Sequence, residues 1–147
     1  LFCEIAEKMS NEKVKFIWIG NKEEVKLTKD NILMLGEIAN AQDYLRYADL
    51  FILPSNYEGL PISIIESLAY KKPIIASKVG GIVEILNGKN GFAIENHVDC
   101  FVDKIKYVLL DEERYSQFCI NARSTYELQF TIDQMYNNYL KLYKTNV

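Results

Sequence analysis

The sequence of 147 residues has few cysteines and a single histidine, and this scarcity excludes several kinds of site. Cys3, Cys100 and Cys119 are odd in number and do not have the spacing of metal ligands. We interpret them as reduced thiols of a cytosolic protein. His97 has no cysteine or histidine partner at metal-ligand spacing, so we expect it to be structural or exposed. No metal site is predicted.

Long apolar runs and runs of one charge are also missing. No stretch reaches the length of a membrane span, and no signal peptide is visible. The formal net charge is −3, with acidic and basic residues mixed along the chain, so nucleic-acid binding has little support. The sequence also lacks a G-x-G-x-x-G motif, a Walker loop and a serine nucleophile elbow, which argues against nicotinamide, NTPase and triad-hydrolase chemistry.

What is present is a core of ordinary size, because 49% of the residues are apolar. Short, continuously apolar runs predict strands at residues 14–19, 32–35, 49–53, 74–76 and 92–94. Helical patterns indicate helices at residues 2–9, 41–47 and 61–70, with a short helix after Gly81 that reaches Leu86. We expect residues 21–30 to form a loop or a short helix.

Three further apolar stripes, within residues 98–109, 115–126 and 132–143, predict amphipathic helices packed on the surface. Apolar strands separated by helices are typical of an α/β fold, with a Rossmann-like parallel sheet covered by helices on both faces. We therefore interpret residues 1–147 as a single domain, with C-terminal helices from about residue 97 to residue 145.

The stretch PSNYEGLPISIIESLAYKKPIIAS, residues 54–77, is the most informative part of the sequence. An apolar strand runs into a loop with Gly59 and Leu60, and Pro61 suits the first turn of a helix. Ligands of doubly wound sheets bind at the carboxyl ends of strands, and the start of a helix favours an anion. Gly59 lets the backbone approach a ligand closely. Gly59, Leu60 and the helix start therefore form a candidate diphosphate or sugar cradle.

Two carboxylates flank this cradle, with Glu58 in the loop and Glu66 eight positions later in the helix. Glu66 lies among apolar residues, so we expect partial burial, and a ribose diol could supply the donors that a buried carboxylate needs. The alternative for Glu66 is a solvent-facing or salt-bridged glutamate. Glu58 could bind the transferred sugar or stabilise positive charge at its anomeric centre. The alternative for Glu58 is an ordinary exposed acid in a turn.

Residues 49–91 resemble the donor-binding region of the GT-B retaining glycosyltransferases of family 4, and a weaker likeness covers the whole chain. The likeness rests on ADLFILPSNYEGLPISIIESLAYKKPIIASKVGGIVEIL, with Ala-Asp before the strand, Pro-Ser at its end, Glu-Gly-x-Pro, the E-x7-E pair and Gly-Gly before a glutamate. Asn90–Gly91 before the last strand also fits. Gly80 and Gly81 look structural, shaping the turn after a strand.

The resemblance implies roles for particular residues. Glu66 would hold the ribose hydroxyls of the donor, and Glu58 would be the catalytic residue that faces the donor sugar. Gly59 and Leu60, just before Pro61, would offer backbone N–H groups to the sugar or the diphosphate. The base would be flanked by two residues of an earlier strand end, Leu35 and Gly36.

The resemblance also implies what the whole protein does. The chain would be the second half of a GT-B fold and would bind a nucleotide diphosphate sugar. The enzyme would transfer a sugar, with retention, to a glycan or lipid-linked acceptor in polysaccharide biosynthesis. No cofactor and no metal are expected. We expect a cytoplasmic protein, with any contact to the inner face of the membrane made by the absent half.

That absent half would be an N-terminal acceptor domain, and the first strand and loop of the second half would be absent with it. The fragment alone is expected to be inactive. Because the missing strand is normally central in the sheet, either its neighbours pair directly or the natural chain extends upstream of Leu1.

Other functions stay open from the sequence. Within enzymes, a domain like that of a glycogen or starch synthase, or of a GT-B sugar epimerase, is an alternative. Outside enzymes, the alternative is a non-catalytic α/β interaction module of the receiver type. Such a module would need an acidic cluster after its first strand and a lysine near its end, and neither is apparent.

Overall fold

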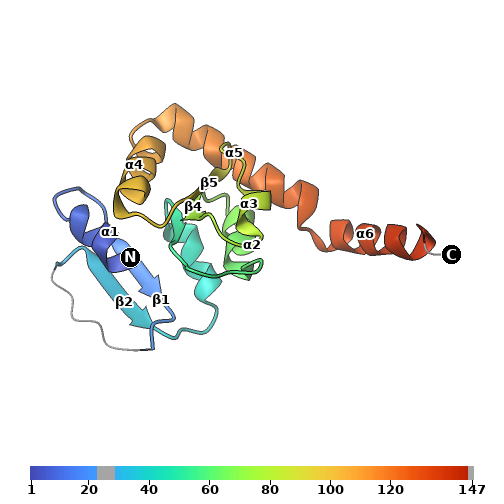
Figure 1. Ribbon diagram of the computed structural model, residues 1–147, viewed down its shortest axis with the longest axis horizontal. Coiled ribbons are helices and arrows are strands. Elements are labelled where there is room, and N and C mark those ends of the chain that lie inside the picture. Colours follow the sequence, from blue (N-terminus) through green and yellow to red (C-terminus); the bar gives the residue numbers. More distant parts are fainter. Residues whose placement is uncertain (23–28, 146–147) are drawn as a thin grey trace.

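The computed structural model describes residues 1–22 and 29–145, and the five strands in this part of the chain are all paired in parallel (Figure 1). They form two separate sheets. One pairs β1 (Phe16–Ile19) with β2 (Ile32–Gly36), and the other has the order β3 (Phe51–Leu53), β4 (Ile74–Ser77), β5 (Gly91–Ile94). The loop or helix predicted for residues 21–30 falls largely outside the described residues.

Helices cover both faces of the sheet of β3, β4 and β5, as the apolar strands predicted, whereas Ile17 and Leu33 stay exposed on one face of the sheet of β1 and β2. β4 shows this most clearly, because successive side chains of a strand point to opposite faces. Ile75 belongs to one apolar cluster, whereas Ile74 and Ala76 belong to the other. The first cluster is covered by α1 (Phe2–Lys8) and α4 (Val98–Leu109), and the second by α2 (Ile62–Ala69), α3 (Ile82–Ile85) and α5 (Glu112–Gln129).

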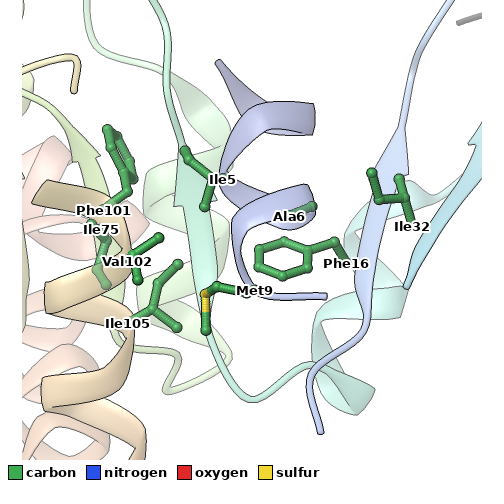
Figure 2. Close-up of a cluster of buried hydrophobic side chains, with 9 residues drawn as sticks. All are labelled: Ile5, Ala6, Met9, Phe16, Ile32, Ile75, Phe101, Val102 and Ile105. Atoms are coloured by element: carbon green, nitrogen blue, oxygen red, sulfur yellow. The ribbon is translucent and has the colours of Figure 1, made fainter. Parts of the chain in front are cut away.

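The first cluster joins the two sheets. Figure 2 shows side chains of α1 between Phe16 and Ile32 on one side and, on the other, Ile75 together with the side chains of α4. The ring of Phe2 also packs edge-on against Phe16, with 5.9 Å between ring centroids. No ladder connects β1 to β3 in the described chain, so of the two alternatives for the missing strand, direct pairing of its neighbours does not occur there. Packing through α1 and α4, rather than backbone hydrogen bonds, sets the spacing of the sheets.

Two strands begin later than predicted. β1 begins at Phe16, whose N–H donates to the Asn31 carbonyl at 2.8 Å. β3 begins at Phe51, whose N–H donates to the Pro73 carbonyl at 3.0 Å. Pro73 has no N–H with which to continue the ladder toward Asp49. The helix predicted at residues 41–47 is the 3-10 helix η1 (Ala41–Tyr47).

Side-chain caps define the starts of the long C-terminal helices. His97 is the N-cap of α4, and its Nδ1 accepts a hydrogen bond from the Asp99 N–H at 3.3 Å. Asp111 caps α5 in the same way, accepting from the Arg114 N–H at 2.9 Å. Such caps satisfy N–H groups that have no partner within the helix. The exposed, structural role predicted for His97 is therefore confirmed.

The last helix, α6 (Ile132–Thr145), extends away from the body of the molecule toward the C-terminus (Figure 1). Most of its large apolar side chains stay more than half exposed, Ile132 and Tyr143 among them, whereas Leu140 is half-buried. The prediction that this third stripe packs on the surface was wrong for the described residues. None of the helices in those residues combines the length and apolar character that a membrane span requires.

Candidate functional site

The loop between β3 and α2 carries most of the predicted site residues. Glu58 is half-buried there, while Gly59 and Leu60 are exposed. Pro61 is the N-cap of α2, with φ −70° and ψ 127°, so the helix begins one residue later than predicted, at Ile62. The Pro61 carbonyl still accepts the N–H of Ile64 at 3.1 Å, which closes the first turn.

The start of α2 is suited to an anion. No side chain caps it, and its first turn holds no acidic residue. The first N–H groups of an α-helix have no partner within the helix, and the helix dipole adds positive potential at that end. Gly59 and Leu60 lead directly into this uncapped helix start, and their role as a cradle stays a prediction.

Glu66 lies in the second turn of α2. The helix is held by Ile64 and Leu68, which are fully buried in the second cluster. Ile62 lies one turn before Glu66 and is 71% exposed, so the two share the outer side of the helix. Glu66 is half-buried, as predicted, and no described residue forms an ion pair with its carboxylate or with that of Glu58. Both carboxylates are thus available to a ligand.

The turn after β4 packs directly against the backbone of the Glu58 loop. Gly80 has φ +52°, and a Cβ placed on it would lie 1.8 Å from the Glu58 carbonyl oxygen. Gly81 donates its N–H to the Gly59 carbonyl at 2.8 Å. The two glycines do shape a turn, as predicted, but they are needed because the loop that carries Glu58 lies against them.

Two residues at this site were not predicted from the sequence. Ser77 is the last residue of β4, and Asn96 lies between β5 and α4. The Asn96 amide donates to the Ser55 carbonyl at 2.9 Å and to Asn56 Oδ1 at 3.1 Å, and its oxygen accepts from the Ser77 hydroxyl. Nothing in the local sequence marks Asn96. Ser77 is a polar residue at the end of an otherwise apolar strand, and this is the one feature of the sequence that hints at a polar contact there.

Leu35 and Gly36, predicted to flank the base, lie at the carboxyl end of β2 in the other sheet. Gly36 has φ +68°, its N–H donates to Asn21 Oδ1 at 3.0 Å, and its carbonyl accepts the Gly20 N–H at 2.7 Å. These contacts fix the ends of β1 and β2 to each other. They do not connect Leu35 and Gly36 to the Glu58 loop, so a role near the base stays a prediction.

A cavity of about 590 Å³ lies elsewhere, lined by Met9, Val14, Asp49, Ile105 and Tyr115 among others. None of its lining residues belongs to the Glu58 loop or to α2. Burial, with a hydrogen bond to Cys119, raises the pKa of Tyr115 well above its ordinary value. No group of three or more histidine, cysteine or acidic side chains that could hold a metal occurs in the described chain.

The sequence profile described as "Glycosyl transferases group 1" matches residues 1–125. The chain belongs to this family. The O-antigen biosynthesis glycosyltransferase WbnH of Escherichia coli is 35% identical over 116 residues, which are 79% of this chain and 31% of that protein. The N,N'-diacetylbacillosaminyl-diphospho-undecaprenol alpha-1,3-N-acetylgalactosaminyltransferase of Campylobacter jejuni is 31% identical over 144 residues, 92% of this chain and 38% of that protein.

A solved structure of S. aureus TarM in complex with fondaparinux, alpha-GlcNAc-glycerol and UDP is 26% identical to this chain, with a TM-score of 0.77. The match covers 96% of this chain and 31% of TarM. The group 1 chain therefore has the α/β architecture of GT-B glycosyltransferases, as predicted. It spans about a third of the length of the curated relatives that it matches. Family membership favours a glycosyltransferase over the interaction-module alternative.

Proposed function

We propose that this group 1 chain is the donor-binding part of a retaining glycosyltransferase. The whole enzyme would transfer a hexose or related sugar from a nucleotide diphosphate sugar to a glycan or lipid-linked acceptor. The observation that carries this proposal is the junction of β3 and α2, where two unpaired carboxylates flank an exposed glycine loop and an uncapped helix start. A nucleotide sugar offers the complementary groups, namely a diphosphate, a ribose diol and a sugar.

Each part of the donor has a counterpart in this arrangement. The diphosphate would lie at the start of α2, where the backbone N–H groups of Ile62 and Ser63 are free of side-chain caps. The ribose hydroxyls would donate to Glu66, one turn farther along the outer side of the helix. The sugar would lie against Glu58 and Gly59. TarM, crystallised with UDP, supports a nucleotide with a diphosphate as the ligand.

The chemistry follows from these positions. The bond from the anomeric carbon to the diphosphate oxygen breaks, and the acceptor hydroxyl forms the new bond on the same face, giving its proton to the departing diphosphate. Positive charge develops at the anomeric carbon during this exchange, and the carboxylate of Glu58 would stabilise it. Retention of configuration rests on the likeness to family 4 enzymes. No metal is required in this scheme, because the helix start offsets part of the charge on the diphosphate.

The acceptor would be bound by residues outside this chain. The relatives are about three times as long as the matched part, and the Campylobacter jejuni relative is named for a lipid-linked diphosphate sugar. We therefore propose an acceptor-binding half elsewhere in a longer protein, located in the cytoplasm, with any membrane contact made by that half.

A thermal-shift panel tests the proposal. The chain is heated with UDP, GDP, ADP and their common sugar conjugates, in parallel with Glu66→Ala. A ligand at 100 times its Kd stabilises a protein by about 2.7 kcal/mol, which is readily seen as a shift in Tm. We expect one nucleotide and its conjugates to stabilise the wild type and to lose most of that effect in Glu66→Ala. Absence of any shift, both in this chain and in a longer natural protein, would contradict the proposal.

A further inference from the structure

The carboxyl ends of β3, β4 and β5 are tied together through one side chain, that of Asn96. Its Nδ2 donates to the Ser55 carbonyl at 2.9 Å and to Asn56 Oδ1 at 3.1 Å. Its Oδ1 accepts from the hydroxyl of Ser77. Both amide hydrogens and the amide oxygen are therefore engaged. The side chain reaches from the loop after β5 to the loop after β3, across the end of β4.

Ser77 anchors this arrangement in the core. It is completely buried, and its hydroxyl lies 3.3 Å from the Leu53 carbonyl as well as within hydrogen-bond distance of Asn96. A hydroxyl has one hydrogen to donate, so the two acceptors share it. Burying a hydroxyl without a partner costs free energy, and Asn96 offers the Ser77 hydroxyl an acceptor in addition to the Leu53 carbonyl.

The loop that these contacts hold has no apolar anchor of its own. None of residues 54–61 is buried, and the ring of Tyr57 is 92% exposed. The backbone of the loop is therefore fixed by polar and backbone contacts at two places. Asn96 holds residues 55 and 56, and the Gly80–Gly81 turn holds Glu58 and Gly59.

We propose that Asn96 is a positioning residue for the donor sugar, because it fixes the loop that places the Glu58 carboxylate. This inference rests on the proposed function insofar as Glu58 faces the sugar. Asn96 acts through Ser55 and Asn56. The nucleotide part of the donor depends on α2, which is held separately by buried Ile64 and Leu68. Loss of the Asn96 contacts should therefore lower the affinity for the sugar part of the donor and leave the affinity for the nucleotide unchanged.

Asn96→Asp is the most direct variant. It keeps the shape of the side chain, removes both donors and places a carboxylate against two acceptor oxygens. Asn138→Asp, on exposed α6, is the matched control for the added charge. Asn96 is itself exposed, so its replacement leaves the core in place. Asn96→Ala, which adds no charge, is the second variant should Asn96→Asp be unstable.

The first readout is the backbone order parameter S² of residues 55–60 from NMR relaxation, compared with that of β4 and α2. Loss of the Asn96 hydrogen bonds should lower S² in the loop from the value of a rigid backbone, about 0.85, toward that of a flexible one, below about 0.6. We expect this in both Asn96 variants, with S² in β4 and α2 unchanged, and no change in Asn138→Asp. Loop S² equal to that of the wild type, in a variant with the wild-type Tm, would overturn the proposal.

The second readout is affinity, measured by calorimetry for the nucleotide and the nucleotide sugar that the wild type binds, namely UDP with UDP-N-acetylglucosamine, GDP with GDP-mannose or ADP with ADP-glucose. We expect the nucleotide Kd of Asn96→Asp to stay within about twofold of the wild-type value. Its Kd for the nucleotide sugar should rise about tenfold. Equal losses for both ligands would assign Asn96 a purely structural role. Absence of binding to any of these ligands, both in this chain and in a longer natural protein, contradicts the proposed function, while the order parameters still decide whether Asn96 holds the loop.

Discussion

Replacement of Glu66 by alanine should weaken nucleotide binding far more than it affects the fold. The carboxylate can accept from both ribose hydroxyls, and a hydrogen bond to a charged group contributes about 1.5–3 kcal/mol. Because Glu66 is only half-buried, water can replace part of this interaction. We therefore expect a loss of about 2–4 kcal/mol in total, or about 30-fold to 1,000-fold in Kd.

The fold should tolerate Glu66→Ala. Its carboxylate has no ion-pair partner among the described residues, and α2 is anchored by Ile64 and Leu68 rather than by Glu66. Alanine is also a better helix former than glutamate. The Tm of the unliganded variant should therefore stay close to that of the wild type.

The assay is isothermal titration of the nucleotide into wild type, Glu66→Ala and a matched control. Glu113→Ala removes an exposed helical glutamate from α5 and should leave the nucleotide Kd unchanged. An unchanged affinity in Glu66→Ala, with the fold intact, would refute the ribose role of Glu66. An equal loss in Glu113→Ala would indicate that overall charge, rather than a specific bond, controls binding.

Further predictions concern the glycine turn, the carboxylate of Glu58, pH and metal. Gly80→Ala should lower the free energy of unfolding by about 2 kcal/mol or more, because its Cβ would overlap the Glu58 carbonyl. Gly88 also has a positive φ but open space around it, so Gly88→Ala should lower the free energy of unfolding by only about 1 kcal/mol. Denaturant titrations measure both. Glu58→Gln in the whole enzyme should reduce turnover more than nucleotide affinity, and an equal reduction in both would make Glu58 a binding residue only. Because the pKa of Tyr115 is raised, mainly by burial, the unfolded chain loses that proton first, so stability should fall as pH rises through about 10. Tyr115→Phe should show a smaller fall in alkaline urea titrations. Removal of divalent metal with EDTA should leave nucleotide binding unchanged in calorimetry.

The order of strands and helices could be predicted from the sequence because continuously apolar strands and helical stripes are local patterns. The first and last residues of the strands and helices were less predictable, because they depend on neighbouring segments with which the chain pairs or packs. β3 is short because the ladder of β4 begins after Pro73, which has no N–H to offer. The exposed stripe of α6 has the same periodicity as a packed one, and the sequence of α6 does not say which surface meets it.

The residues of the candidate site differ in the same way. The positions of Glu58, Gly59 and Glu66 on a loop and a helix were predictable because strand, loop and helix follow one another in the chain, while their roles stay predictions. Asn96 was not, because its acceptors in residues 55 and 56 lie 41 and 40 positions away. Gly80 was predicted as a turn residue, but the approach of its Cα to the Glu58 carbonyl is a property of the folded chain.

A nucleotide sugar should bind where β3 meets α2. The decisive test follows the backbone amide signals of the wild-type chain by NMR during titration with the nucleotide sugar selected in the thermal-shift panel. We expect the largest shifts at Gly59, Leu60, Ile62 and Ser63, with smaller ones at Glu66. Shifts concentrated instead around the cavity of Met9, Asp49 and Tyr115, with these amides unmoved, would contradict this expectation.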